Sequence, residues 1–363
     1  MVKMCKIVTV VGARPQFIKM VQVSKELVKN HVEEIVVHTG QHYDYEMNKI
    51  FFDQLNLPEP QYYLGVGSGP HGSQTGEMLK KVEEVLIKEK PDMVLVYGDT
   101  NSTLAGALAA AKLHIKIGHV EAGLRSFDKR MPEEINRVLT DHVSDLLFAP
   151  TETAVKNLYN EGVKNGVHLT GDVMYDSLLD NIKIAEGKSN ILEDLGIRPK
   201  EYLLATVHRA ENTEKEKLEN IIDAFIESGE QIVFPAHPRT VKSLKAYRLY
   251  SKLQDLGSVL LIKPVGYLDM LLLEKNAKKI LTDSGGIQKE AYFLKVPCII
   301  LRDTTEWIET VNDGWNILVG AEKEKISKAI REFEPKGQRY TYTFGDGKAS
   351  KKIVEIVGTE IGK

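Results

Sequence analysis

The feature that most constrains the fold of this chain is a regular alternation of short apolar runs with amphipathic segments. The runs are rich in Val and Ile and have the length of buried strands, whereas the segments between them place apolar residues at helical spacing. The expected strands span 6–11, 34–39, 93–97, 115–120 and 146–149, and then 202–207, 231–235, 259–263, 279–282 and 296–301. This alternation predicts an α/β fold with parallel, doubly wound sheets.

The strands fall into two sets, which indicates two Rossmann-like domains. A chain of 363 residues also exceeds the size that one hydrophobic core ordinarily supports. The pattern restarts near residue 170, so we expect a first domain over 1–170 and a second over 171–348. The amphipathic stretch 349–363 has no strand after it, and we expect it to pack back on the first domain as a helix.

The composition excludes several classes of function. The net charge is −3 and no basic stripe occurs, so nucleic acid is not an expected partner. Cys5 and Cys298 lie in separate apolar runs, and no Cys-x-x-Cys pair suggests metal or redox chemistry. No apolar run reaches the roughly eighteen residues of a membrane helix, and the N-terminus lacks the apolar region of a signal peptide. A cytoplasmic protein is therefore expected.

Polar residues follow the predicted strands of the first half, where open parallel sheets bind their ligands. Arg14 follows the first strand beside a predicted helix start and suits a phosphate, although an exposed turn arginine is equally compatible. Asp99 and Glu121 end two further strands, and Glu133 with Glu134 opens the next helix, where acidic residues are stabilising in any case. Carboxylates that converge there would separate their pKa values and form an acid beside a base.

The second half combines basic residues with a glycine pair at its strand ends. His208-Arg209 ends one strand and His237 ends the next, which suggests a site for an anion. Ser284-Gly285-Gly286 then ends a strand and opens a helix, an arrangement that exposes backbone N–H groups to a pyrophosphate. A helix cap explains Ser284 but not the two glycines. Glu290 lies further along that helix, within reach of ribose hydroxyls.

Several of these motifs together resemble one family. They are Gly-Ala-Arg-Pro-Gln-Phe-Ile-Lys, Tyr-Gly-Asp-Thr, Gly-His-Val-Glu-Ala-Gly-Leu-Arg, Pro-Glu-Glu-Ile-Asn-Arg, Thr-Asp-Ser-Gly-Gly-Ile-Gln-Lys-Glu and Leu-Arg-Asp-Thr-Thr-Glu. Their order and spacing resemble the non-hydrolysing UDP-N-acetylglucosamine 2-epimerases from the first strand to near the C-terminus. The resemblance implies the glycosyltransferase-B fold, with two Rossmann-like domains that face each other across a cleft, and a homodimer.

The resemblance also implies a reaction without cofactor or metal. UDP leaves C1 as the C2 proton is lost, which gives a 2-acetamidoglucal, and re-addition yields UDP-N-acetylmannosamine. Residues are assigned by matching position. Asp99, Glu121 and Glu133 match the acid–base carboxylates, and His208 acts with them on the departing diphosphate. The nucleotide contacts are Arg14, Lys19, Met270, Ser284, Gly285, Gly286 and Glu290.

Two departures from the family pattern bear on the site. Trp307 stands where bacterial members usually have arginine, so an arginine contact to the nucleotide is missing or supplied elsewhere. Bacterial members also bind a second, activating UDP-N-acetylglucosamine. Gln41, Glu134, Arg209 and His237 match parts of that regulatory site, but the basic residue of its glycine-rich loop has no counterpart.

Three other functions remain to be separated from this one. A hydrolysing epimerase would release N-acetylmannosamine and UDP, and product analysis distinguishes it. A glycosyltransferase on the same fold would need an acceptor site, because fold alone does not determine function. A catalytically inactive nucleotide-sugar binding protein is disfavoured by the retention of all three carboxylates and of His208.

Overall fold

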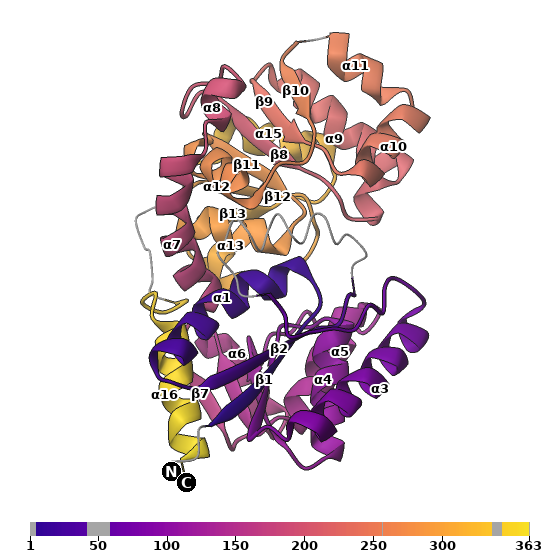
Figure 1. Ribbon diagram of the computed structural model, residues 1–363. Helices are drawn as coiled ribbons and strands as arrows, with labels where there is room; N and C mark the ends of the chain where they lie inside the picture. The colour runs from indigo at the N-terminus through magenta and orange to yellow at the C-terminus, as the bar shows by residue number, and fades with distance from the viewer. Residues whose placement is uncertain (1–4, 42–58, 256, 336–342, 363) are drawn as a thin grey trace. The chain divides into compact units, whose positions relative to one another are not determined.

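The computed structural model describes residues 5–41, 59–255, 257–335 and 343–362 (Figure 1). The chain divides into two compact units, one formed by Met1–Ser177 with Tyr342–Lys363 and the other by Leu178–Thr341. Each unit contains one parallel sheet with helices on its faces. The predicted α/β class with doubly wound parallel sheets is therefore confirmed.

The sheet of the first unit has seven strands in the order β3-β2-β1-β4-β5-β6-β7. The strands are β1 (Lys6–Val11), β2 (Glu33–His38), β3 (Tyr62–Tyr63), β4 (Met93–Tyr97), β5 (Lys116–Val120), β6 (Leu146–Ala149) and β7 (Val167–Leu169). The helices that belong to it are α1 (Arg14–Lys29), α3 (His71–Glu89), α4 (Asn101–Lys112), α5 (Pro132–Val143), α6 (Glu152–Asn160) and α16 (Ala349–Ile361). The strand order reverses between β1 and β4, which places a topological switch point, the usual ligand position, there.

The sheet of the second unit has six strands in the order β10-β9-β8-β11-β12-β13. The strands are β8 (Leu203–Thr206), β9 (Ile232–Pro235), β10 (Val259–Ile262), β11 (Lys279–Thr282), β12 (Cys298–Ile300) and β13 (Asn316–Leu318). The helices are α8 (Ile191–Asp194), η1 (Glu211–Thr213), α9 (Lys215–Ser228), α10 (Pro238–Ala246), α11 (Leu249–Asp255), α12 (Tyr267–Asn276), α13 (Gly285–Phe293), α14 (Ile308–Asn312) and α15 (Lys323–Glu332), and α7 (Val173–Lys188) runs from the first unit into this one. Here the order reverses between β8 and β11.

Both faces of the second sheet are covered, which explains why its strands read as continuous apolar runs. Successive residues of a strand point to opposite faces. On β8, Leu203 and Ala205 belong to one buried cluster, whereas Leu204 belongs to another on the opposite face. The first cluster includes Phe225 of α9, and the second includes Ala291 of α13.

The C-terminal helix α16 packs against α1 of the first unit, as the sequence predicts. Its first turn is held by Asp176, whose carboxylate accepts hydrogen bonds from Ala349 N at 3.1 Å and Ser350 N at 2.8 Å. Burial raises the pKa of Asp176, and these hydrogen bonds oppose that rise. A buried acceptor on α7 thus fixes the return of the chain to the first unit.

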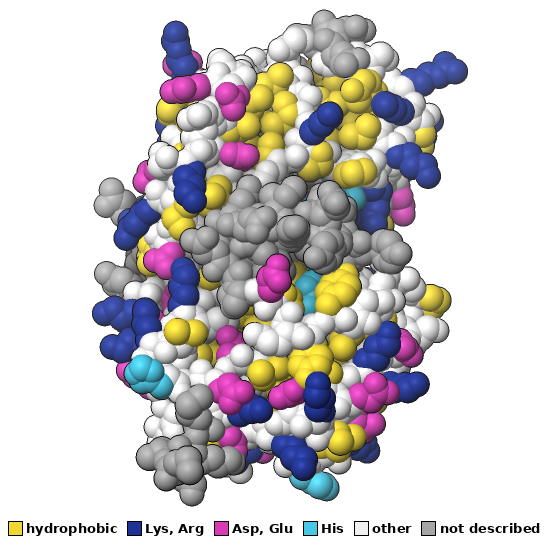
Figure 2. Space-filling view, in the orientation of Figure 1, with side chains coloured by type: hydrophobic (Ala, Val, Ile, Leu, Met, Phe, Trp, Pro, Cys, Tyr) yellow, Lys and Arg dark blue, Asp and Glu magenta, His cyan; other side chains and the backbone are white. Residues whose placement is uncertain are grey.

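The described surface carries both signs of charge. On the face shown in Figure 2, Lys and Arg side chains are interspersed with Asp and Glu over both units. Within the described part of the chain, no helix is long and apolar enough to cross a lipid bilayer.

Burial of His38 at the end of β2 makes the stability of the first unit depend on pH. The ring packs between Phe17 and Tyr63, and its Nδ1 accepts a hydrogen bond from Gly40 N at 2.8 Å. Burial lowers the pKa of His38 to about 4, so the unfolded chain binds a proton more readily than the native one below the ordinary value of 6.5. We expect the free energy of unfolding to fall by about 3 kcal/mol through this group as the pH drops from 6.5 to about 4.

Urea unfolding of the native chain and of His38→Phe across that pH range measures this contribution. The stability of the variant should depend less on pH, because the group that titrates only in the unfolded state has been removed. Parallel pH profiles for the two proteins would contradict the assignment.

Candidate active site

The predicted carboxylates of the first unit lie where its sheet ends. Asp99 follows β4, Glu121 follows β5, and Glu133 lies in the first turn of α5. Gly98 precedes Asp99 with a φ of +63°, a conformation that favours glycine. A Cβ at Gly98 would lie 3.2 Å from Lys19 Nζ and 3.7 Å from Glu121 Oε1. The turn before Asp99 therefore touches the side chains of both Lys19 and Glu121.

Lys19 and Glu121 form a buried ion pair. Lys19 Nζ lies 2.5 Å from Glu121 Oε1, and the two side chains are only 10% and 6% exposed. A buried charge requires a partner of this kind, because an isolated carboxylate would be strongly disfavoured away from water. Glu121 also has a φ of 74°, in the left-handed region that costs a side-chain-bearing residue conformational energy. Strain of this kind concentrates at functional sites, and here it orients an acid–base candidate.

Arg137 of α5 connects the carboxylates, and the sequence analysis gave it no role. Its guanidinium forms ion pairs with Asp99 Oδ2 and with Glu134 Oε2, the latter at 3.2 Å. Asn136 of the same helix donates to Asp99 O at 3.0 Å. Glu133 precedes Arg137 by one helical turn, and residues four apart lie on the same helix face. Glu133 therefore lies on the helix face that carries Arg137, the partner of Asp99, and this spacing was the available signal for Arg137.

Two of the predicted regulatory residues take part in the internal structure of the first unit. Glu134 is buried, and its carboxylate accepts hydrogen bonds from Ser126 N at 2.8 Å and Phe127 N at 3.0 Å. Gln41 Oε1 accepts from Ser102 N at 3.0 Å and from Ser102 Oγ at 2.6 Å. The side chain of Arg14, a predicted phosphate contact, lies outside the described residues, although its backbone begins α1.

Asp283 organises the basic residues of the second unit. It is fully buried at the end of β11 and accepts hydrogen bonds from His208 N at 3.0 Å and from Arg209 N at 3.0 Å. His208 Nδ1 lies 3.1 Å from Asp283 Oδ1. Burial opposes ionisation of Asp283, but these bonds and the charge of His208 hold the pKa of its carboxyl below the ordinary value. Asp283 is thus the residue that anchors His208.

The predicted basic groups of the second unit lie together. Arg209 Nε donates to Asp283 O at 3.3 Å, and Arg239 Nη1 donates to His208 O at 3.3 Å. His237 caps α10 by accepting a hydrogen bond from Arg239 N at 3.2 Å, and its ring centroid lies 6.3 Å from that of His208. Burial lowers the pKa of His237, and the positive charges of His208 and Arg239 lower it further. The negative charge of Asp283 opposes this shift.

No close contact among the described residues explains why the two positions at the start of α13 are glycine. Gly285 and Gly286 both have ordinary helical backbone, so neither needs the conformational freedom of glycine. A Cβ at Gly285 would meet its nearest described atom, Trp307 Nε1, at 3.5 Å, and one at Gly286 would meet Ser284 Oγ at 3.9 Å. Those are ordinary contact distances. The first N–H groups of a helix have no partner within it, and glycines leave them open to an anion.

Glu290 and Met270 lie on α13 and α12 of the second unit. Glu290 is 6% exposed and its Oε1 accepts a hydrogen bond from Tyr267 Oη at 3.1 Å. Met270 N donates to Gly266 O at 3.0 Å inside α12, and its side chain packs against the core of this unit. The N–H of Met270 is therefore already engaged in its helix.

Trp307, the departure from the family pattern, is a buried residue beside the glycine pair. The ammonium of Lys289 forms a cation–π contact with the Trp307 ring, and Nζ lies 3.9 Å from the ring centroid. The neighbouring Glu306 is paired with Arg302 through two contacts of 3.0 and 3.1 Å. Burial opposes ionisation of Glu306, but Arg302 keeps the pKa of its carboxyl below the ordinary value. Arg302 thus holds its guanidinium against Glu306, the residue that precedes Trp307.

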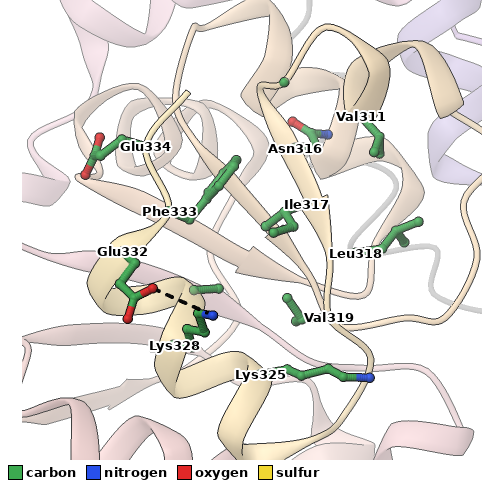
Figure 3. Close-up of a pocket in the computed structure, with 12 residues that line it drawn as sticks. Val311, Asn316, Ile317, Leu318, Val319, Lys325, Lys328, Glu332, Phe333 and Glu334 are labelled. Atoms are coloured by element: carbon green, nitrogen blue, oxygen red, sulfur yellow. Dashed lines mark ion pairs between the residues drawn. The ribbon is translucent and has the colours of Figure 1, made fainter. Parts of the chain in front are cut away.

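The second unit also contains a cavity of about 550 Å³ that is lined by other residues than those of the candidate site (Figure 3). It is lined by Ile317 and Leu318 of β13, by residues of α15 and by Phe333, which directly follows α15. Lys328 and Glu332 of α15 form an ion pair among the lining residues. None of the residues that line this described cavity is a predicted site residue. The cavity therefore does not define the candidate site.

Comparison with known proteins places this geometry in one family. The family profile described as UDP-N-acetylglucosamine 2-epimerase matches residues 25–358. Two proteins of Methanococcus maripaludis are similar to this chain. A UDP-N-acetylglucosamine 2-epimerase homolog is 67% identical over 97% of this chain and 99% of its own length. A UDP-N-acetylglucosamine 2-epimerase is 49% identical over 98% of this chain and 98% of its own length. A UDP-2,3-diacetamido-2,3-dideoxy-D-glucuronate 2-epimerase of Pseudomonas aeruginosa is also 49% identical, over 97% of this chain and 99% of its own.

A solved structure agrees with the sequence comparison. The crystal structure of Methanocaldococcus jannaschii UDP-GlcNAc 2-epimerase in complex with UDP-GlcNAc and UDP matches with a TM-score of 0.88 and 50% identity, covering 98% of this chain and 99% of the other. The predicted glycosyltransferase-B fold is thereby confirmed. From the family profile, these relatives and this shared fold together, the chain belongs to the UDP-N-acetylglucosamine 2-epimerase family.

Proposed function

We propose that this protein interconverts UDP-N-acetylglucosamine and UDP-N-acetylmannosamine at C2 without hydrolysis. The observation that carries the proposal is the group of Asp99, Glu121 and Lys19 at the carboxyl edge of the first sheet, with Glu133 on the adjoining face of α5. Inversion at C2 requires a proton to be handled on both faces of that carbon, and several carboxylates around one sugar meet this need. Each well-placed acid or base contributes about 10²–10⁴ in rate.

The reaction consists of an elimination followed by an addition. A carboxylate removes the C2 proton, the C2 electron pair forms the C1–C2 double bond, and the C1–O bond to UDP breaks, which gives a 2-acetamidoglucal and UDP. UDP then adds back to C1 as a proton reaches C2 on the other face. Lys19 and Arg137 stabilise Glu121 and Asp99 as carboxylates between these steps.

The second unit supplies donors for the diphosphate. The N–H groups at the start of α13 are positioned as a backbone cradle, and His208 is oriented by Asp283 so that its second ring nitrogen can contact phosphate. The resemblance assigns Arg14 and Lys19 to phosphate and Glu290 to the ribose. The engaged N–H of Met270 leaves its side chain, or a neighbouring backbone group, as the contact for uracil.

A second candidate substrate, UDP-2,3-diacetamido-2,3-dideoxy-D-glucuronate, has a specific observation in its favour. In Methanococcus maripaludis, the relative at 49% identity is named UDP-N-acetylglucosamine 2-epimerase, and the relative at 67% identity is named a homolog of that enzyme. The Pseudomonas aeruginosa enzyme named for the diacetamido uronate matches this chain at 49% as well. Both substrates carry UDP at C1 and an acetamido group at C2, so the same carboxylates could invert either one.

Product analysis with both substrates tests the proposal. We expect UDP-N-acetylglucosamine to give a mixture of two UDP-linked epimers on anion-exchange chromatography. A higher kcat/KM for the diacetamido uronate would make that sugar the substrate, while turnover of neither would overturn the function. Release of free N-acetylmannosamine with UDP would show the hydrolysing reaction instead.

In the remaining features of the proposal, the homodimer follows from the family resemblance, and the location and the domain bounds follow from the sequence pattern. We infer a homodimer in the cytoplasm, with domains at 1–170 plus 349–363 and at 171–348. An activating site that uses Gln41, Glu134, Arg209 and His237 stays a prediction, and the internal hydrogen bonds of Glu134 make it the weakest member of that set.

A further inference from the structure

A buried histidine that the proposed mechanism does not use contacts the turn that carries Asp99. His119 is on β5, two residues before Glu121, and its side chain is fully buried. Its Nε2 lies 2.7 Å from Gly98 O, the carbonyl that precedes Asp99, and its Nδ1 lies 2.7 Å from Asp141 Oδ1 on α5. The ring therefore bridges the turn that carries Asp99 and the helix that carries Glu133.

Both contacts of the ring are with acceptors. A backbone carbonyl oxygen only accepts hydrogen bonds, so Nε2 must carry hydrogen. Asp141 Oδ2 already accepts from Arg125 Nη1 at 2.7 Å and Gly123 N at 3.1 Å, as a carboxylate does. With Asp141 ionised, Nδ1 must also carry hydrogen.

The charged side chains around the ring are Asp141, Arg125 and the more exposed Glu161. Arg125 pairs with Asp141 and forms two contacts, of 2.7 and 2.6 Å, with Glu161. His142, which is 45% exposed, approaches Glu161 from the solvent side at 3.5 Å. Asp141 and Arg125 are buried and carry one charge of each sign, whereas Glu161 is an exposed residue whose charge is solvated. The protonation of the ring is therefore inferred from its two acceptor contacts.

From this juxtaposition we propose that His119 is a positioning residue of the reaction. Its Nδ1–H donates to Asp141, which holds the ring, and its Nε2–H donates to the Gly98 carbonyl, which fixes the orientation of Asp99. Through Asp141, which also holds Gly123 N, the same group fixes the turn that carries Glu121. His119 contacts no reacting atom; it sets the distance between two groups that do, and the proposal rests on the proposed function.

The protonation is tested without reference to activity. In ¹⁵N NMR of protein labelled at its imidazole nitrogens, the two resonances that disappear in His119→Gln belong to His119. We expect both to have imidazolium shifts and attached hydrogens at neutral pH. One nitrogen at the position of an unprotonated imidazole would overturn the assignment, whether or not the protein epimerises the sugar.

The positioning role is tested by kinetics on His119→Gln and His119→Ala. We expect kcat to fall about 10²-fold, because a small misplacement of reacting groups has effects of that size. KM and the Kd for UDP should stay within about threefold. Free imidazole should restore part of kcat to His119→Ala, and thiazole, a ring of the same shape without an N–H, should not.

His168 of β7, whose ring stacks on Phe148 of the same sheet, provides the matched control. Turnover by His168→Ala should equal that of the native chain. Three results would each overturn the positioning role. The first is a fall in kcat that parallels a loss of UDP affinity, and the second is equal rescue by thiazole and imidazole. The third is an unchanged kcat in both His119 variants. If His119→Ala does not fold, the kcat and KM of His119→Gln alone test the positioning role: a lower kcat with an unchanged KM supports it, and an unchanged kcat overturns it.

Discussion

Replacing Asp99 with Asn, Glu121 with Gln or Glu133 with Gln is expected to reduce turnover about 10²–10⁴-fold in each case. The reason is that each change removes a proton-transferring carboxylate while keeping the shape and much of the hydrogen bonding of the side chain. The affinity for UDP should stay within a few fold, because these groups face the sugar in the proposed mechanism. Steady-state kinetics and titration calorimetry with UDP measure the two effects separately.

A matched control comes from Glu152, an exposed carboxylate in the first turn of α6 in the same unit. Glu152→Gln should turn over substrate as the native chain does. Glu121→Gln also leaves Lys19 buried beside a neutral partner, so its melting temperature must be measured before its kinetics are interpreted. If UDP affinity fell together with turnover in all three variants, the carboxylates would be structural and the proposed mechanism would fail.

The second large effect is expected at the start of α13. Gly286→Val should weaken UDP binding about 10- to 100-fold, since each charge-assisted hydrogen bond lost contributes about 1.5–3 kcal/mol. The added side chain would obstruct the N–H groups at the helix start, yet the nearest described atom to a Cβ there is 3.9 Å away. The fold should therefore tolerate the change, and calorimetry with UDP measures it.

Gly358→Val in α16 is the control for this substitution, because it also places a β-branched residue into open space on a helix. It should lower the melting temperature by an amount similar to Gly286→Val and leave the Kd for UDP unchanged. Native affinity in Gly286→Val would remove α13 from the nucleotide site.

The sequence predicts the long buried strands well because burial on both faces produces continuous apolar runs. Strands β4 and β11, for example, coincide with the predicted 93–97 and 279–282. The edge strands β3, β7 and β13 were not predicted. They have only two or three residues each, which is too short to show a periodicity, and they form through pairing with a neighbour that is distant in sequence.

Some residues of the candidate site could likewise be predicted from the sequence, and others could not. Asp99, Glu121 and His208 could be named as candidates because the carboxyl ends of parallel strands are the usual position of a ligand. Arg137, Asp283 and His119 were not assigned roles, because their importance depends on partners brought close only by the tertiary fold. The left-handed backbone of Glu121 likewise has no signal in the local sequence.

The central claim is that the carboxylates of the first unit invert C2 by elimination and re-addition of UDP. The most direct test is an NMR experiment in deuterated water with UDP-N-acetylglucosamine, the protein and no added nicotinamide cofactor. The account predicts that deuterium replaces the C2 proton in both epimers while each stays attached to UDP. Full retention of the C2 proton during conversion, or a deuterated sugar that accumulates free of UDP, would contradict it.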